Sequence, residues 1–211
     1  MTISSPSSKV YQEAAQCLSE IDADWARHIA EVGPCRHEPK PAREPYEALV
    51  RAIAYQQLHA KAGDAILARL LALYPDGAFP MPEQLLDTDP AKQRACGFSA
   101  TKLETIRGIA QATIDGVVPT RSEALDLSDD EIVDRLITLR GVGKWTVEMF
   151  LIYTMARLDI LPVNDFGVRE GYRRLKGLQK TPTPREMNVV GEALRPWRTV
   201  AAWYLWRLPA R

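Results

Sequence analysis

Leu139-Arg140-Gly141-Val142-Gly143-Lys144-Trp145-Thr146 lies between two amphipathic helical patterns, and its Gly-Val-Gly core predicts a tight hairpin joining two helices. Glycine suits this hairpin because the chain must take a positive φ there and let its backbone approach another molecule closely. The helix that follows presents N–H groups and a positive dipole end, which suit a phosphate. We therefore expect a grip on a phosphate backbone at the hairpin. Asp165, twenty residues beyond Trp145, is expected to supply chemistry close beside it.

Apolar residues recur every three or four positions through most of the chain, which indicates helices. Ser99 is placed to cap one helix, and the patterns Ser-x-x-Glu at Ser128 and Thr-x-x-Glu at Thr183 predict capping boxes on two more. We find no convincing alternating pattern of a strand, so the chain is predicted to be all-α. The expected helices cover residues 10–32, 45–56, 60–74, 83–86, 90–95, 99–114, 128–137, 144–157, 165–175, 184 onward and 197–208.

Charge is unevenly distributed along the chain. Lys+Arg and Asp+Glu number 27 each, so the formal net charge is zero. Residues 166–211, however, carry ten basic against three acidic residues, whereas residues 1–165 carry 17 against 24. A basic C-terminal part on an otherwise acidic chain suits a polyanion bound to one face. Charge alone fits a solvated basic surface equally well.

The cysteines and the hydropathy pattern limit the class of protein. Three widely spaced cysteines, Cys17, Cys35 and Cys96, fit a reducing cytoplasm better than a disulfide framework. No apolar run approaches the length of a membrane span, and residues 1–9 lack the apolar core of a signal peptide. We expect these first residues to be a disordered tail.

The pattern Leu-x-Gly-Val-Gly-x-Trp-Thr that begins at Leu139, followed by Leu161-Pro162-Val163-Asn164-Asp165, resembles the helix-hairpin-helix (HhH-GPD) base-excision DNA glycosylases. Within them it is most similar to the DNA-3-methyladenine glycosylase II branch. Residues 52–58 resemble the family's segment that enters the DNA, residues 97–102 a turn that opens a helix, and residues 196–206 its terminal helix. Four ordered segments with matching spacing, spread over Pro45 to Leu208, are far more specific than a lone Gly-Val-Gly.

The resemblance implies an all-α fold of two lobes. Residues 45–157 would form a helical barrel that ends in the hairpin. Residues 1–44, a tail and a helix, would pack with a C-terminal lobe of residues 158–211. In this family the hairpin holds DNA phosphates, the duplex is bent and the target nucleotide is flipped into a cleft between the lobes. Asp165 would stand on one side of that cleft and Trp145 on the other.

Asp165 matches the catalytic aspartate of the family. N-alkylation gives a purine a positive charge and weakens its glycosidic bond, so the transition state resembles an oxocarbenium ion. A fixed carboxylate can stabilise that sugar cation or orient the attacking water. An aspartate at the start of a helix is most often an ordinary N-cap. With the hairpin upstream, the catalytic interpretation is favoured.

The base pocket that the resemblance implies consists of Trp145, Met149, Tyr153 and Trp206. The first three are spaced i, i+4 and i+8 along one helix face. Such an apolar stripe is usually core, which is the favoured interpretation for Tyr153. An electron-rich indole stacks well on a cationic methylated base, which favours the pocket for Trp145. Met149 departs from the aromatic residue of well-known relatives, although methionine is adaptable enough to line a pocket.

Lys144 bears on the type of glycosylase. Bifunctional members of the superfamily place a lysine nucleophile at the position of Trp145, form a Schiff base and nick the strand. In this chain the lysine is one residue earlier, about 100° around the helix. We therefore predict a monofunctional enzyme that leaves an abasic site, with Lys144 in contact with a phosphate.

The expected contacts with DNA come from the hairpin and from the segment near residue 57. Gln57 aligns with the residue that wedges into the duplex in place of the flipped base, and Leu58 is adjacent to it. The alternative, that Gln56 and Gln57 face solvent, is about equally favoured, and His59 fits either a phosphate contact or a plain surface position. The full set is Gly141, Val142, Gly143, Lys144, Thr146, Gln57, Leu58 and His59.

No cofactor is implied. The iron–sulfur cluster of several relatives needs four cysteines near the C-terminus, and no cysteine lies beyond Cys96. His28, Cys35 and His37 match no zinc spacing. Hairpins of this family can hold a monovalent cation through backbone carbonyls.

The resemblance also implies the setting in which the protein acts. We expect a monomer that acts on damaged double-stranded DNA, without a membrane, in the cytoplasm of a bacterium and at its nucleoid. Two alternatives stay open. One is a glycosylase for oxidised or mismatched bases, and the other is a non-catalytic helix-hairpin-helix DNA-binding module.

Overall fold

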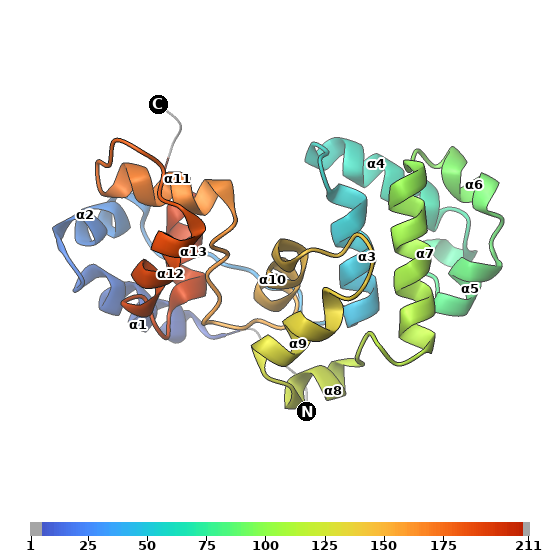
Figure 1. Ribbon diagram of the computed structural model, residues 1–211, viewed down its shortest axis with the longest axis horizontal. Helices are drawn as coiled ribbons and strands as arrows, with labels where there is room; N and C mark the ends of the chain where they lie inside the picture. Colours follow the sequence, from blue (N-terminus) through green and yellow to red (C-terminus); the bar gives the residue numbers. More distant parts are fainter. Residues whose placement is uncertain (1–5, 209–211) are drawn as a thin grey trace. The chain divides into compact units, whose positions relative to one another are not determined.

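The computed structural model describes residues 6–208. Within that range the chain forms thirteen α-helices, one short 3-10 helix and no strand, which confirms the predicted all-α class (Figure 1). The chain divides into two compact units. The hairpin unit comprises residues 42–150, and the terminal unit joins the residues up to 41 with those from 151 onward. Residues 1–5 of the expected N-terminal tail lie outside the described range, and Ser8 and Lys9 are already helical.

The hairpin unit is built around α7 (Ala100–Ile114), which packs against α3 (Pro45–Tyr55) and α5 (Pro82–Asp87), as Figure 1 shows. Leu49, Leu85 and Ile109 are completely shielded from solvent within this unit. Burying such a side chain contributes about 1.5–3 kcal/mol. The other elements are α4 (Ala60–Leu71), the 3-10 helix η1 (Pro75–Gly77), α6 (Pro90–Ala95), α8 (Arg121–Asp126), α9 (Asp129–Leu136) and the first part of α10 (Lys144–Tyr153).

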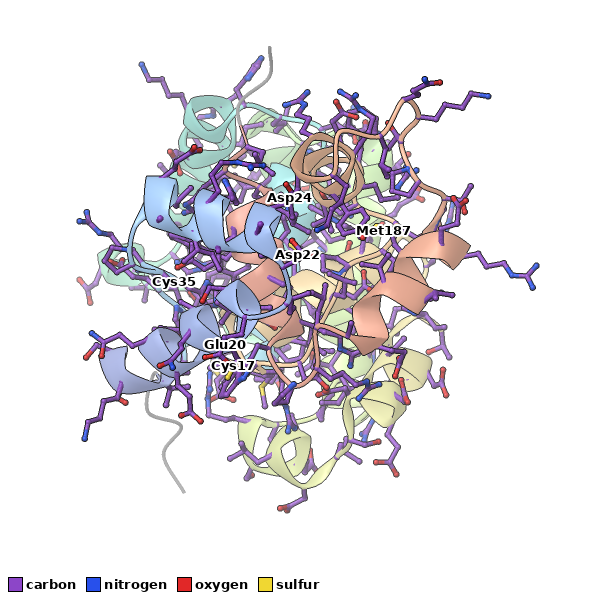
Figure 2. All side chains as sticks on the ribbon, turned by 90° about the vertical axis from the view of Figure 1, so that its left-hand side faces the viewer. Cys17, Glu20, Asp22, Asp24, Cys35 and Met187 are labelled. Atoms are coloured by element: carbon purple, nitrogen blue, oxygen red, sulfur yellow. The ribbon has the colours of Figure 1, made fainter. Side chains whose placement is uncertain are left out.

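The terminal unit has α13 (Arg198–Leu205) as its most deeply buried helix, with every residue from Thr199 onward buried. This helix packs against α11 (Phe166–Leu175), α1 (Ser8–Ser19) and α2 (Ala23–Val32). α11 approaches it so closely that a Cβ on Gly171 would lie 2.2 Å from the carbonyl oxygen of Leu205. The last helix, α12 (Pro184–Glu192), adds Met187 to the core, which also contains Cys35 (Figure 2).

The N-terminal helix is interrupted, and the prediction of one continuous helix over residues 10–32 was wrong. α1 ends at Ser19 and α2 begins at Ala23. Asp22 is the reason: its carboxylate accepts hydrogen bonds from the N–H groups of Asp24 and Trp25, which makes it an N-cap. Lys176 pairs with Asp22 and also lies 3.4 Å from Asp24, so the break is fixed from α11's end (Figure 2 labels both aspartates). Apolar periodicity runs through the break and cannot reveal it.

Capping explains the other helix limits. The side chains of Ser99, Ser128 and Thr183 accept hydrogen bonds at the starts of their helices, and the latter two form the predicted capping boxes. α10 stops at Tyr153 instead of continuing to residue 157. Ala156 has a φ of 54°, and the N–H of the next residue donates to the carbonyl of Leu151 at 3.0 Å. A left-handed residue with such a closing bond ends a helix.

Two histidines and one cysteine are buried within the terminal unit. Nε2 of His28 is 2.8 Å from the carbonyl oxygen of Tyr204, and Nε2 of His37 is 3.2 Å from that of Ile152. Burial raises the pKa of Cys35 to about 11. Among residues 6–208, no group of three or more His, Cys, Asp or Glu is placed to hold a metal ion. The helices of the same range are all too short or too polar to cross a membrane.

Candidate active site

The hairpin between α9 and α10 approaches α7 closely, and one glycine makes this approach possible. Gly141 has a φ of +82°, and a Cβ at this position would lie 2.2 Å from Oγ1 of Thr105. Both facts require glycine, as the sequence predicted for this turn. The next residue, Val142, is 4% exposed, and its N–H donates to the carbonyl of Leu139 at 3.0 Å. The hairpin is therefore anchored from within by a valine side chain and a close backbone contact.

The predicted phosphate-contacting residues divide into exposed and buried ones. Gly141, Gly143 and Lys144 are exposed, and Nζ of Lys144 lies 4.0 Å from a carboxylate oxygen of Glu148. Thr146 is 2% exposed, and both its hydroxyl and its N–H are used inside the unit. Gly143 departs from the expected geometry, because the described positive-φ residues do not include it. The side chains of Val142 and Thr146 thus shape the hairpin from beneath.

An open cavity of about 830 Å³ lies in the hairpin unit, between the end of α3 and the face of α10. It brings together two predicted pocket residues, Trp145 and Met149, with the predicted DNA-contacting segment. Trp145 is 40% exposed, so it is not sealed within the core of the unit. The complete lining is Ala52, Tyr55, Gln56, Gln57, Leu58, His59, Trp145 and Met149.

The turn from α3 to α4 projects outward at the rim of this cavity. Gln57 has a φ of 57°, a left-handed conformation that costs a non-glycine residue about 1–2 kcal/mol. Gln57, Leu58 and His59 are all exposed. Sparsely populated backbone conformations persist where the surroundings enforce them, and they cluster at functional sites. The sequence left open whether Gln57 faces solvent or DNA, and both interpretations need the exposure that is observed.

Tyr55 is a cavity residue that the sequence did not single out. Its ring lies so close to α4 that a Cβ at Gly63 would be 2.3 Å from it. Its hydroxyl donates a short hydrogen bond to Asp64. That hydrogen bond to Asp64 is the main cause that raises the pKa of the phenol, and burial raises it further. Because Tyr55 fits the apolar repeat of α3, only the packing against a glycine of the next helix could have distinguished it.

Asp165 lies in the terminal unit, at the start of α11. Its Oδ1 accepts hydrogen bonds from the N–H of Val168 at 2.9 Å and from Nε1 of Trp206 at 3.0 Å. Asp165 is thus an N-cap and, at the same time, the partner of a second predicted site residue. The side chain is partly exposed, so it is not sealed within the core. The helix N-terminus favours a negative charge at this position.

The indole of Trp206 is held on two further sides. It stacks on the ring of Tyr153, with centroids 6.5 Å apart and planes 23° from parallel. A Cβ at Gly167 would lie 3.0 Å from both Oδ1 of Asp165 and Cδ1 of Trp206, so glycine makes room for their contact. Burial raises the pKa of Tyr153, and the charge of Asp165 raises it further while Arg207 opposes it. Three predicted site residues therefore form one cluster within the terminal unit.

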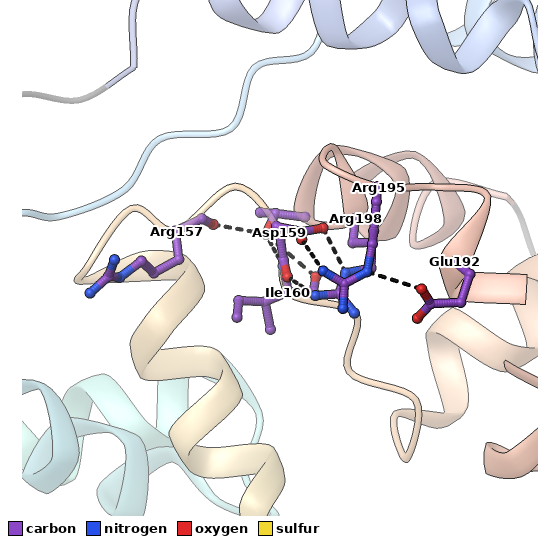
Figure 3. Close-up of polar contacts among 7 residues, drawn as sticks. Arg157, Asp159, Ile160, Glu192, Arg195 and Arg198 are labelled. Atoms are coloured by element: carbon purple, nitrogen blue, oxygen red, sulfur yellow. Dashed lines mark hydrogen bonds and ion pairs between the residues drawn. The ribbon is translucent and has the colours of Figure 1, made fainter. Parts of the chain in front are cut away.

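A network of charged side chains fixes the loop that leads to Asp165 (Figure 3). Asp159 pairs with Nε of Arg198 at 2.6 Å and with Nη1 of Arg195 at 3.0 Å. The hydroxyl of Thr199 donates to the carbonyl of Arg157 at 2.8 Å and accepts from the N–H of Ile160 at 3.1 Å. The loop is thereby fastened to α13, which also precedes Trp206. Sequence reasoning missed this network because its members are separated by about forty positions.

Comparison with known proteins identifies the superfamily to which the chain belongs. The profile of the HhH-GPD superfamily of base excision DNA repair proteins matches residues 50–196. DNA-3-methyladenine glycosylase 1 of Schizosaccharomyces pombe is 46% identical over 191 residues, covering 90% of this chain and 84% of the relative. The chain therefore belongs to the HhH-GPD superfamily, as its hairpin motif predicted.

Two solved structures share the fold. A Schizosaccharomyces pombe 3-methyladenine DNA glycosylase in complex with abasic DNA superposes with a TM-score of 0.84 and 44% identity, covering 92% of this chain and 95% of that one. DNA-3-methyladenine glycosidase of Bacillus halodurans gives 0.81 and 31%, covering 92% and 88%. The predicted HhH-GPD fold is confirmed. The monovalent cation expected at the hairpin stays a prediction.

Proposed function

We propose that this protein is a monofunctional DNA glycosylase that hydrolyses the N-glycosidic bond of alkylated purines, of the 3-methyladenine type, in double-stranded DNA. The observation that carries the proposal is the carboxylate of Asp165. It stands at the start of α11 and is oriented by Trp206 and the N–H of Val168. The names of the relatives, several of them DNA-3-methyladenine glycosylases, support the substrate class.

The reaction breaks the bond between C1′ of the sugar and the ring nitrogen of the base. The alkylated purine leaves with the bonding electron pair, which neutralises its positive charge. Water then adds to the oxocarbenium-like sugar and loses a proton. A carboxylate fixed beside the sugar stabilises the developing positive charge or accepts a hydrogen bond from that water. Asp165 is assigned this role, and Trp206 is assigned the orientation of its carboxylate.

We assign DNA binding to the hairpin unit. Gly141, Gly143 and Lys144 offer an exposed start of α10 to a phosphate, where the helix dipole is positive. The cavity beside Trp145 offers an aromatic face to a cationic base. The exposed turn at Gln57 supplies the wedge. Base flipping requires such a wedge, because the unstacked gap in the duplex must be filled.

The monofunctional assignment rests on α10. The position at which bifunctional relatives place a lysine holds Trp145, which lines the cavity. Lys144 is directed at Glu148 of the same helix, with Nζ 4.0 Å from Oε1. No Schiff base is therefore expected, and the product is an abasic site in an intact strand.

Release of free base from methylated duplex DNA tests the proposal. Purified protein should liberate 3-methyladenine, identified by mass spectrometry, and Asp165→Asn should bind the same DNA while releasing none. Full activity of Asp165→Asn would remove Asp165 from the mechanism. Binding without any release by the wild type would favour the non-catalytic DNA-binding module, and release of oxidised or mismatched bases alone would favour the other glycosylase class.

The location of the protein follows from its substrate. An enzyme that acts on duplex DNA works where the cell keeps its genome, and we propose the bacterial nucleoid. Fractionation of cells expressing the tagged protein, with and without nuclease treatment, would test this. Release of the protein from the DNA-containing fraction by nuclease is the expected result.

A further inference from the structure

A lysine to which the sequence resemblance assigned no role binds the segment that lines the cavity. Lys102 extends from the first turn of α7 to the end of α3. Its Nζ donates hydrogen bonds to the carbonyl of Ala54 at 3.0 Å and to the carbonyl of Gln56 at 2.5 Å. The side chain is only partly exposed, and burial lowers the pKa of the ammonium group. The last carbonyls of a helix lack intrahelical partners and carry negative partial charge, so a cation there both caps and stabilises them.

The two bonded carbonyls bracket the start of the exposed turn. Gln56 is the C-cap of α3, and the next residue, Gln57, has the left-handed φ of 57°. The side chain of Gln56 is tied down as well, since its Nε2 donates to Oγ1 of Thr146 at 3.2 Å. The turn is thus held by Lys102 from α7 and by Thr146 from α10. A non-glycine residue stays in this conformation only when its surroundings impose it.

We propose that Lys102 is a positioning residue of the glycosylase, which holds the Gln57 turn in the conformation that enters the DNA. This inference rests on the proposed function, because a fixed orientation of the Gln57 turn matters for the reaction only if that turn inserts into the DNA. Lys102 acts through the backbone and touches neither base nor sugar. Its loss should slow the flipping-dependent step while leaving the affinity for undamaged duplex nearly unchanged.

The experiment compares wild type, Lys102→Met, Gln57→Ala and the double variant. Excision is followed in single-turnover reactions on methylated duplex DNA. Flipping is followed by the fluorescence of a 2-aminopurine placed next to an abasic-site analogue. Lys92→Met, which removes an exposed lysine of the same unit, is the matched control. Melting temperatures establish that each variant is folded.

Lys102→Met removes both hydrogen bonds to the turn. We expect it to lower the excision rate about tenfold or more, with binding of undamaged duplex unchanged. Lys92→Met should match the wild type. If Lys102 acts through the turn, Gln57→Ala already abolishes what it contributes, so the double variant should be no slower than Gln57→Ala alone. Hydrogen exchange of the peptide over residues 55–59 should accelerate in Lys102→Met without DNA.

Three results would overturn the inference. They are an unchanged excision rate in folded Lys102→Met, fully multiplicative losses in the double variant, and unchanged exchange over residues 55–59. If Lys102→Met does not fold, Lys102→Leu removes the same donor, and a wild-type excision rate in that folded variant overturns the inference equally. A wild type that releases no base refutes the proposed function instead. The hydrogen-exchange measurement then still tests whether Lys102 holds the turn at Gln57.

Discussion

Replacing Trp206 with phenylalanine removes one hydrogen bond from the carboxylate of Asp165 while keeping an aromatic ring in place. The bond joins Nε1 of Trp206 to Oδ1 of Asp165 over 3.0 Å. Phenylalanine can still stack on Tyr153, which lies 6.5 Å away between ring centroids. The substitution therefore isolates the orienting hydrogen bond from the packing of the ring.

The magnitude follows from the partial exposure of the pair. Hydrogen bonds to charged groups contribute about 1.5–3 kcal/mol net, and partial exposure of both side chains favours the lower end. If all of about 1.5 kcal/mol is needed to hold the carboxylate in its reactive orientation, the excision rate should fall about tenfold. Asp165→Asn should cost far more, because it removes the charge itself.

Single-turnover excision from methylated duplex DNA measures this effect without interference from product release. Trp197→Phe is the control, since Trp197 is partly buried and packs against the core of the terminal unit. Affinity for duplex containing an abasic-site analogue should be unchanged in both variants. An unaltered excision rate in Trp206→Phe would refute the orienting role.

Three other predictions address the hairpin, an ion pair and the type of enzyme. Gly141→Ala should destabilise the protein by about 2–3 kcal/mol in urea denaturation, because the new Cβ would meet Thr105 and the backbone has a positive φ; wild-type stability would contradict the tight approach. The hydrogen bond from Arg173 is the main cause that lowers the pKa of Glu170 to about 2. A lowered pKa means that the stabilisation is present above the ordinary value near 4.5 and is lost as the pH falls through about 2. Glu170→Gln should therefore lower the urea midpoint at pH 7 and converge with the wild type near pH 2, and a difference that persists there would refute the assignment. Borohydride should trap no covalent complex with DNA, because Lys144 is displaced from the nucleophile position; a trapped adduct would contradict a monofunctional enzyme.

The sequence was sufficient for the features that depend on neighbouring residues. The hairpin at Gly141, the capping boxes at Ser128 and Thr183, and the position of Asp165 at a helix start all follow from short-range rules of backbone geometry. The break at Asp22 shows the limit of periodicity, because apolar spacing continues across it while a single carboxylate caps a new helix. The hydrogen bonds of this N-cap, and not the apolar periodicity, determine where the helix begins.

What the sequence could not provide are contacts between residues far apart in the chain. Asp165 is forty-one positions from Trp206, and Lys102 is forty-six from the carbonyl of Gln56. The resemblance named Asp165 and Trp206 for separate roles, and only the structure joins them by a hydrogen bond. Lys102 lies in the segment of residues 97–102 that resembles the family, but its own sequence neighbours do not distinguish it, because a lysine in the first turn of an amphipathic helix ordinarily faces solvent.

The cluster around Asp165 and the turn at Gln57 are held in place in the same way, and this affects how fast the proposed reaction would be. In each, a residue that we propose acts on the DNA is fixed by a donor distant in the sequence: the indole of Trp206 for Asp165, and the ammonium of Lys102 for the Gln57 turn. Fixing groups before the substrate arrives removes reorganisation from the catalytic step. The same donors should therefore affect rate more than affinity. A variant of either donor that weakened DNA binding as much as it slowed excision would show that they merely stabilise the fold.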